Sequence, residues 1–373
     1  MSASSAQPTV VVGAGPAGSA AAWHLATAGH PVLLVDKARF PRDKSCGDGL
    51  TGGAIAELAR MGLRPNEVKG CQWVDRTNFV SPSGRPVGLS TGGDGIGPWL
   101  GAVSREELDK QLLDRARAAG AVVVEGDRVE AVRPNSGVVE IDLEGGTTFR
   151  PEAVIAADGA WSSVRRSIEG SAAHLSKWQA SRVYVDRVDG PGANQAFVWF
   201  DADLLPGYAW SFPLGGGRAN LGVGALRGAG GGGAWIVKRT ERLLEEATTV
   251  LGSAARPSGR SLVWPIPTDL RRSRLTALDG RVLFVGDAAG ATDPMTGEGI
   301  AEALMTGRLA AEAVASGRPA DYSRLAWRAL GGRHRRRARC SRLLSRPPIA
   351  SLGLAVADLS PWTRRQFAGW VFS

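Results

Sequence analysis

The stretch TVVVGAGPAG, residues 9–18, decides the fold. A β-branched run, Thr9–Val12, leads into a glycine turn, and the alanine-rich stretch Ser19–Ala28 that follows is typical of a helix. Pro31–Val35 predicts a second strand, which ends in Asp36. A strand, a glycine turn, a helix and a strand ending in an acidic residue form the dinucleotide-binding pattern of an α/β protein.

Each glycine of the turn has its own physical reason. Gly13 permits the tight turn, Gly15 lets backbone N–H groups approach a pyrophosphate, and Gly18 allows the helix to pack closely on the strand. Asp36 can accept hydrogen bonds from a ribose, which disfavours a 2′-phosphate there. On this motif alone the cofactor is either NAD or FAD, and a purely structural turn is the remaining alternative.

Length and composition narrow the class. A chain of 373 residues with 43% hydrophobic and 22% charged side chains fits two subdomains or one large α/β unit, and excludes a disordered or fibrous protein. Its cysteines, Cys46, Cys71 and Cys340, are too few for a disulfide framework, and the scattered histidines show no metal-ligand spacing. Since there is also no signal-peptide core and no long apolar run, we expect a reduced, metal-free cytoplasmic protein.

The positive charge of the chain is local. Between Tyr322 and Ala357 there are nine arginines and no Asp, Glu or Lys, and the rest of the chain holds 36 basic and 36 acidic residues. We do not expect nucleic-acid binding, because no aromatic or groove-reading elements accompany the run. The run Arg324–Arg346 then either makes a peripheral contact with an anionic membrane, since the apolar stretch Pro347–Val356 follows it at once, or stays solvated or pairs with acidic residues elsewhere on the fold.

The order of the predicted elements indicates a nucleotide-binding domain assembled from separate pieces. From Val183 to Pro267 the pattern alternates as in a β-sheet, interrupted by a glycine-rich hinge, Gly228–Gly233, and by one helix, Ala234–Leu251. The expected division is a discontinuous cofactor domain over 1–75, 100–182 and 268–330, a substrate domain over 76–99 and 183–267, and a helical basic segment over 331–373.

Two further loops follow predicted strands. Asp158-Gly159 comes after Val154–Ala157, and Gly286-Asp287 comes after Val282–Val285. With these loops and the glycine turn in this order and spacing, the chain resembles the FAD-dependent p-hydroxybenzoate hydroxylase superfamily. The resemblance implies a Rossmann-type FAD-binding domain, an inserted β-sheet substrate domain and a C-terminal helical segment.

The resemblance also implies the residues that hold FAD. Asp287 would bind the ribityl chain, Asp158 would line the cofactor channel, and Arg105 would contact FAD from a helix that begins at a Ser104 capping box. Backbone donors at the start of the helix after Gly299 would stabilise an anionic reduced flavin. The full expected set is Gly13, Gly15, Pro16, Ala17, Gly18, Asp36, Lys37, Cys46, Gly47, Asp48, Arg105, Val129, Asp158, Gly286, Asp287, Gly297, Gly299 and Ile300.

Three segments indicate a branch of the superfamily. PRDKSCGDGL at 41–50 resembles the Cys-Gly-(Gly/Asp)-Gly loop of the geranylgeranyl reductase family, as does TGEGI at 296–300. PGYAWSFP at 206–213 resembles the Tyr-x-Trp-x-Phe-Pro motif that lines the substrate cavity of that family. Tyr208, Trp210 and Phe212 alternate along one strand, so their rings share a face that suits an apolar chain. Without the resemblance they could equally be sheet core.

The family implies reduction of isolated C=C bonds of an isoprenoid or another apolar substrate by hydride transfer from reduced flavin. NAD(P)H or another reductant, such as an electron-donor protein, would reduce the flavin. Isolated alkenes accept hydride poorly, so a proton must be supplied, and Cys46 is the candidate acid or relay. The opposing interpretation of Cys46 is a small packing residue.

Two other functions stay open at this stage. The first is a flavin-dependent monooxygenase or halogenase acting on an aromatic or polyketide-type metabolite. A halogenase needs a lysine, for which Lys69 is the only candidate in its region, and Cys46-Gly47 argues against that branch. The second is a protein that binds FAD only to carry or sense a ligand.

Overall fold

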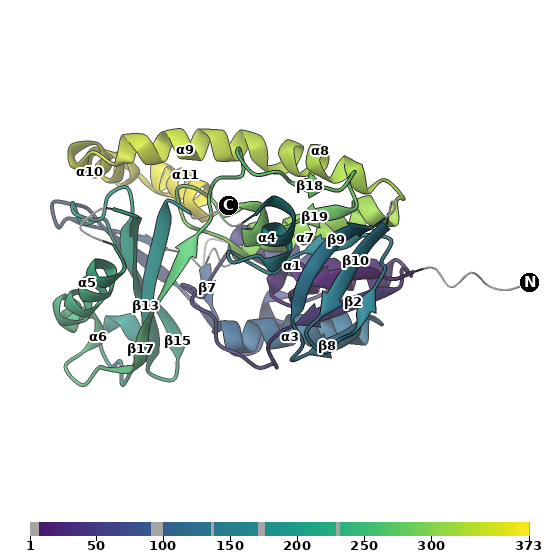
Figure 1. Cartoon of the computed structure of the whole chain (residues 1–373). Coiled ribbons are helices and arrows are strands. Elements are labelled where there is room, and N and C mark those ends of the chain that lie inside the picture. Colours follow the sequence, from purple (N-terminus) through teal and green to yellow (C-terminus); the bar gives the residue numbers. More distant parts are fainter. Residues whose placement is uncertain (1–6, 91–99, 136–137, 171–175, 229–231, 373) are drawn as a thin grey trace, which may run out of the picture.

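The computed structural model describes residues 7–90, 100–135, 138–170, 176–228 and 232–372. Within these ranges the chain forms two sheet-based domains with C-terminal helices laid along one side of both (Figure 1). The α/β class with an inserted β-sheet domain, expected from the sequence, is confirmed. Residues 91–99 of the expected substrate domain, 229–231 of the glycine-rich hinge and His174 lie outside the described residues.

The first domain is built on a mainly parallel sheet of buried strands. In the described residues its order is β18-β19-β12-β1-β2-β8, and only β18 runs antiparallel to its neighbour. These strands are β1 (Thr9–Val12), β2 (Val32–Asp36), β8 (Val122–Glu125), β12 (Val154–Ala156), β18 (Thr276–Ala277) and β19 (Val282–Phe284). Since β12, β1 and β19 point the same way, the loops after them meet at one edge of the sheet.

Two helices cross closely beside this edge. Helix α1 (Pro16–Thr27) begins three residues before the expected Ser19, because proline fits the first position of a helix. It packs on α7 (Ile300–Ala315) through small residues: a Cβ on Gly307 would lie 2.1 Å from the carbonyl oxygen of Ala17. This contact sets both helix N-termini at the same edge of the sheet.

Smaller elements complete the first domain. Helix α3 (Arg105–Ala118) packs on α1, and its N-cap Ser104 accepts a hydrogen bond from the backbone N–H of Glu107, as the capping box predicts. The others are β3 (Gly49–Thr51), α2 (Gly52–Arg60), η1 (Pro65–Glu67), β4 (Gln72–Trp73), β7 (Leu100–Ala102), β9 (Val129–Asn135), β10 (Val138–Leu143), β11 (Thr148–Phe149), α4 (Ser163–Glu169) and η3 (Gly286–Ala289).

The second domain joins segments that lie far apart in the sequence. Its sheet has the order β17-β13-β16-β15-β14-β5-β6 among the described residues, so strands from 76–90 pair beside strands from 178–266. The strands are β5 (Arg76–Val80), β6 (Pro86–Ser90), β13 (Trp178–Asp186), β14 (Ala196–Trp199), β15 (Tyr208–Gly215), β16 (Arg218–Leu226) and β17 (Arg256–Ile266), with η2 (Pro191–Ala193) between β13 and β14.

The prediction of a single helix over Ala234–Leu251 is wrong in one respect. It is two helices, α5 (Gly233–Glu246) and α6 (Thr248–Leu251), separated at Ala247. The Thr248 hydroxyl donates to the Glu245 carbonyl oxygen at 2.6 Å, and such local bonds compete with regular helix. Buried Ile236 and Leu243 still fasten α5 to the sheet.

The C-terminal helices run along the top edge of both domains (Figure 1). They are η4 (Pro319–Asp321), α8 (Tyr322–Ala326), a π-helical turn η5 (Trp327–Gly331), α9 (Gly332–Leu344), α10 (Pro347–Ala357) and α11 (Pro361–Phe372). No helix in the described ranges is long and apolar enough to cross a bilayer.

Two arginines of α9 pair with acidic residues elsewhere on the fold, which is one of the alternatives that the sequence left open. Arg337 is buried, and its Nη1 lies 3.0 Å from Asp293 Oδ2. Arg333 pairs with buried Glu302 of α7. Removing one partner of a buried ion pair typically costs about 3–5 kcal/mol, so these arginines fasten α9 to the first domain.

The same place gathers a third titratable side chain. Potential ligand atoms of Asp293, Glu302 and His334 lie within 4.8 Å of one another, a grouping that sequence spacing did not reveal because it joins three separate segments. Both carboxylates already pair with guanidinium groups, and burial lowers the pKa of His334, which favours its neutral form. We therefore assign this cluster to holding α9 against α7.

Candidate active site

A pocket of about 850 Å³ lies along the edge of the parallel sheet and reaches the second domain. Every residue expected to bind cofactor or substrate lines it except Gly18. A Cβ on Gly18 would lie 1.7 Å from the Gly13 carbonyl oxygen, so this glycine has the close-packing position that the motif predicts.

One end of the pocket offers donors for a pyrophosphate. Helix α1 begins after Gly15, and among the described residues no side chain caps its first N–H groups. A Cβ built on Gly15 would have the Nη2 atoms of Arg42 and Arg105 each at 3.7 Å. Asp109 holds Arg105 through two hydrogen bonds of 2.7 Å. A helix N-terminus and two guanidinium groups fit a dinucleotide pyrophosphate.

Asp36 lines this end of the pocket, as the sequence pattern predicts. Its Oδ2 accepts a hydrogen bond from Ala14 N at 2.6 Å, and its Oδ1 accepts one from Ala38 N at 2.8 Å. Each oxygen keeps a further lone pair, so ribose hydroxyls can still donate to it. The backbone thus fixes the carboxylate at the end of β2, where it lines the pocket.

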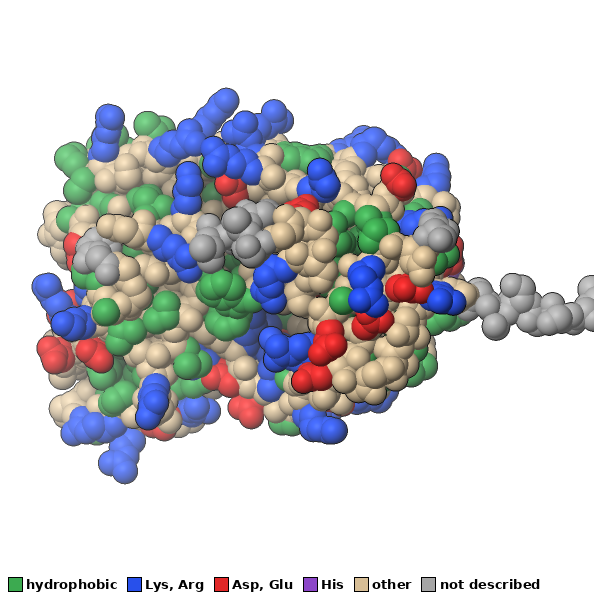
Figure 2. All heavy atoms as spheres, in the orientation of Figure 1, with side chains coloured by type: hydrophobic (Ala, Val, Ile, Leu, Met, Phe, Trp, Pro, Cys, Tyr) green, Lys and Arg blue, Asp and Glu red, His purple; other side chains and the backbone are tan. Residues whose placement is uncertain are grey.

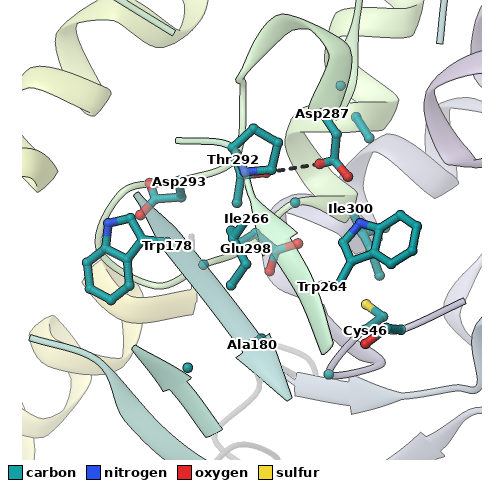
Figure 3. A pocket seen from close by; sticks show the side chains of 18 of the residues that line it. Cys46, Trp178, Ala180, Trp264, Ile266, Asp287, Thr292, Asp293, Glu298 and Ile300 are labelled. Carbon is teal, nitrogen blue, oxygen red and sulfur yellow. Dashed lines mark hydrogen bonds between the residues drawn. The ribbon is translucent and has the colours of Figure 1, made fainter. Parts of the chain in front are cut away.

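The carboxylates of Asp158 and Asp287, which also follow strands of the parallel sheet, have different hydrogen-bond partners. Asp158 Oδ2 caps α4, accepting from the backbone N–H groups of Ser163 at 2.7 Å and Val164 at 3.1 Å, while Oδ1 is buried and has no hydrogen-bond partner among the described residues. Asp287 Oδ1 accepts from Thr292 Oγ1 at 3.1 Å (Figure 3). Its Oδ2 lies 3.2 Å from Lys44 Nζ.

Lys44 and Trp264 are pocket residues that the sequence reasoning missed. Lys44 Nζ lies 5.6 Å from the centre of the Trp264 ring, so the lysine bridges an aromatic side chain of the second domain and Asp287 of the first. Lys44 lies within the quoted 41–50 loop, but no local spacing relates it to position 287. Lys69, in contrast, is exposed and does not line the pocket, so its position gives no support to a halogenase lysine.

The aromatic residues of β15 form one wall. The Tyr208 and Trp210 rings lie 5.9 Å apart and the Trp210 and Phe212 rings 6.4 Å apart. Tyr208 donates to the Thr296 carbonyl oxygen, which ties the wall to the loop before α7. Trp210 is only 5% exposed, so it both lines the pocket and belongs to the sheet core.

The Cys46 loop lies against this wall. A Cβ on Gly47 would lie 3.5 Å from the Trp210 ring, and one on Gly49 would lie 3.4 Å from the Phe212 ring. Cys46 Sγ accepts a long hydrogen bond of 3.4 Å from Asp48 N. Burial raises the pKa of the Cys46 thiol, which keeps its proton at neutral pH even though Arg105 favours the thiolate.

The other cysteines have no such setting. Burial raises the pKa of Cys71 to about 12, and a Cβ on Gly101 would lie 2.8 Å from its sulfur, so Cys71 is a packing residue. Cys340 lies on α9 and does not line the pocket.

Two helix N-termini and a pair of guanidinium groups thus gather where the phosphates and ring of a flavin dinucleotide would lie, which defines a flavin-dependent oxidoreductase. Comparisons with known proteins agree. Residues 6–207 match the FAD binding domain family. The chain is 36% identical to a menaquinone reductase of Mycolicibacterium smegmatis, over 87% of this chain and 80% of that protein.

A digeranylgeranylglycerophospholipid reductase of Methanopyrus kandleri is 34% identical over 81% of this chain and 78% of its own length. In three dimensions the fold matches a geranylgeranyl bacteriochlorophyll reductase-like protein from Thermoplasma acidophilum, with a TM-score of 0.81, 24% identity and coverage of 95% and 92% of the two chains. The chain belongs to the geranylgeranyl reductase family of FAD-dependent oxidoreductases, and the resemblance and the FAD cofactor predicted from the sequence are confirmed.

Proposed function

We propose that this oxidoreductase reduces isolated C=C bonds in the polyprenyl chain of a quinone or an ether lipid. The observation that carries the proposal is the position of Cys46, a protonated thiol in a pocket-lining loop that packs against the aromatic wall. The names of the relatives support this substrate class, since they include reductases of menaquinone and of a digeranylgeranylglycerophospholipid. An apolar wall favours a hydrocarbon chain through the area that it buries.

In this proposal each pocket residue has a separate role in the reaction. Bound FAD, once reduced, supplies the hydride for one alkene carbon. Cys46 supplies the proton for the other carbon, and Tyr208, Trp210 and Phe212 hold the chain and exclude water. Asp287 and Lys44 bind the cofactor beside them, and the reductant is NAD(P)H or an electron-donor protein.

Product analysis tests the proposal. The holoenzyme is reduced without oxygen, mixed with a quinone or lipid that carries an unsaturated polyprenyl chain, and the product is weighed by mass spectrometry. We expect a gain of two hydrogens in the chain. A product that instead gains oxygen would support the monooxygenase alternative.

We further propose that the C-terminal helices dock on an anionic membrane. The docking face combines exposed charged and apolar side chains, namely Arg335, Arg336, Arg339 and Arg342 of α9, Leu352 and Val356 of α10, Leu359 between α10 and α11, and Trp362 of α11. Trp362 is 67% exposed and Leu359 75%. Figure 2 shows Lys and Arg side chains gathered along the edge where α9 runs in Figure 1.

Helix α10 contributes to both the docking face and the lining of the pocket. On α10, Leu354 and Ala350 are buried and line the pocket, whereas Leu352 and Val356 are exposed. The sequence suggested that the whole stretch Pro347–Val356 could contact a membrane. In the structure it is instead divided between residues that line the pocket and residues on the surface. Because α10 and Cys46 line the same pocket, this division would give a lipid chain a route from the bilayer into that pocket.

Vesicle sedimentation tests the docking face. The variant Arg335→Gln/Arg336→Gln/Arg339→Gln should bind anionic vesicles about 10²-fold more weakly, at about 1 kcal/mol for each arginine. Arg337 is left intact because it is buried against Asp293. The matched control replaces Arg133, Arg150 and Arg272, exposed arginines outside the C-terminal helices and the pocket lining, and should bind like the parent. If the parent stays in the supernatant with anionic vesicles at low salt, the docking face is disproved.

A further inference from the structure

The side-chain amide of Asn220 joins the Cys46 loop to the aromatic wall. Asn220 lies on β16 and is fully buried. Its Nδ2 donates to the Cys46 carbonyl oxygen at 2.7 Å and to Asp48 Oδ2 at 2.8 Å, and its Oδ1 accepts from Trp210 Nε1 at 3.0 Å. We propose that Asn220 is a positioning residue that holds the proton donor and the chain-binding wall at a fixed distance. This role rests on the proposed function of Cys46 as the acid.

The three hydrogen bonds fix the direction in which the amide points. An indole N–H group can only donate, so the amide oxygen of Asn220, and not its nitrogen, must face Trp210. Both N–H bonds of the amide are then directed at the loop, where two acceptors lie at 2.7 and 2.8 Å. Turning the amide over would leave buried donors without acceptors, which is costly. The amide therefore sets the loop and the indole ring relative to one another.

Trp210 is itself held by the small residues of β16. Strands β15 and β16 pair so that Trp210 lies opposite Gly222, and Phe212 lies opposite Asn220. A Cβ on Gly222 would lie 2.2 Å from Cζ2 of the Trp210 ring, so the ring lies across that glycine. Because residues two apart on a strand share a face, the indole N–H reaches Asn220 on the same face of β16.

Other hydrogen bonds hold the loop at Asp48. Its Oδ2 also accepts from the Tyr184 hydroxyl at 2.9 Å, and its carbonyl oxygen accepts from Val103 N at 3.0 Å. Asp48 has a φ of +63°, in the left-handed region where a residue with a side chain is strained. The loop thus needs its bonds to keep this conformation, and the bonds of Asn220 connect it to Trp210.

A fixed distance matters for the proposed reaction because the proton and the hydride must reach adjacent carbons of one double bond. Apolar contacts with the wall give the chain no single register, so the position of the acid relative to the wall has to be set by the protein. A displacement of about 1 Å can lower a rate by about 10²-fold. Asn220 does not line the pocket, so it acts through Cys46 and Trp210 rather than on the substrate.

Alkylation of Cys46 tests this role without any substrate. The FAD-loaded protein is treated with iodoacetamide, and peptide mass spectrometry follows Cys46 separately from Cys71 and Cys340. Cys46 of the parent should react slowly, because burial raises the pKa of the thiol and alkylation needs the thiolate. Asn220→Leu, of similar shape but without hydrogen bonds, should free the loop towards water and raise the rate by at least about 10-fold.

The matched control is Asn78→Leu. Asn78 is a buried amide of the same sheet that, like Asn220, donates two hydrogen bonds and accepts one. It does not line the pocket, and its partners are Arg76, Gln195 and Ala196, so Cys46 should react as in the parent. A parent-like alkylation rate in a folded, FAD-loaded Asn220→Leu would overturn the proposal, whether or not the enzyme reduces polyprenyl chains.

Trp210→Phe covers the case in which Asn220→Leu does not fold. It removes the indole N–H but keeps a ring on the wall, and it should raise the Cys46 alkylation rate by about 3-fold, since both bonds from Nδ2 remain. No rise in this variant would also contradict the proposal.

Reoxidation by an unsaturated lipid adds a functional readout. At saturating lipid, reduced Asn220→Leu should be reoxidised about 10–10²-fold more slowly than the parent, while its reduction by the donor is unchanged. Asn78→Leu should match the parent in both half-reactions. If Asn78→Leu slows reoxidation as much as Asn220→Leu, the effect is a general loss of packing and Asn220 has no positioning role.

Discussion

The Cys46→Ala variant is expected to bind FAD and to be reduced by its donor like the parent, yet to lose substrate-dependent reoxidation by about 10²–10⁴-fold. The reason is that the thiol, which burial keeps protonated, is the proposed proton source, whereas flavin reduction does not need it. Stopped-flow absorbance separates the two half-reactions. Each is followed in the same preparation, first with reductant and then with an unsaturated polyprenyl substrate under anaerobic conditions.

The matched control is Cys71→Ala. Cys71 is a cysteine of the same domain that packs against Gly101 and lies outside the pocket lining, so its loss should leave both half-reactions within a small factor. Cys46→Ser separates chemistry from size, because a hydroxyl is a weaker acid of similar shape. If Cys46→Ala reoxidises with substrate as fast as the parent, the residue is only a packing side chain.

Asp287→Ala should weaken FAD binding by about 10–100-fold, the usual effect of losing hydrogen bonds to a charged group. The carboxylate lines the pocket between Thr292 and Lys44, and its removal also leaves the Lys44 ammonium group without its acceptor. Flavin fluorescence during dialysis measures the affinity. The control Asp269→Ala removes an exposed carboxylate that does not line the pocket.

A second readout guards against simple unfolding of Asp287→Ala. Circular dichroism of the apoprotein should match the parent, since the bonds of Asp287 are polar contacts at the pocket rim. A folded variant with unchanged FAD affinity would refute the cofactor-site assignment. A variant that loses both fold and flavin is resolved by Asp287→Asn, which keeps the shape and should still lower the affinity.

Local pattern was enough to predict the dinucleotide-binding half of the fold. The glycine turn, Asp36 and the strand-end loops at Asp158 and Asp287 are each encoded within a few residues, and parallel strands bring their ends together. The prediction did not foresee that Asp158 would use one oxygen to cap α4. Nor did it divide Ala234–Leu251 at Ala247, since one side-chain hydrogen bond there outweighs the helical pattern.

Contacts between distant segments could not be predicted in this way. Asp48 and Asn220 are 172 positions apart, and Lys44 and Asp287 are 243 apart, so neither pair leaves a local signature. The two arginines of α9 that point into the fold did leave a local signature in the sequence. Arg333 and Arg337 are four residues apart and share a helix face, which a helical plot of the arginine run would have separated from Arg335 and Arg336.

The most direct test of the central claim is a single-turnover reoxidation. The holoenzyme is reduced to completion without oxygen, and flavin absorbance is followed after an ether lipid with unsaturated polyprenyl chains is added in one sample and its fully saturated counterpart in another. The account predicts oxidised flavin only with the unsaturated chain, with one C=C bond reduced for each flavin reoxidised. If the flavin stays reduced with the unsaturated lipid, or is reoxidised at the same rate by both lipids, the enzyme does not reduce polyprenyl double bonds.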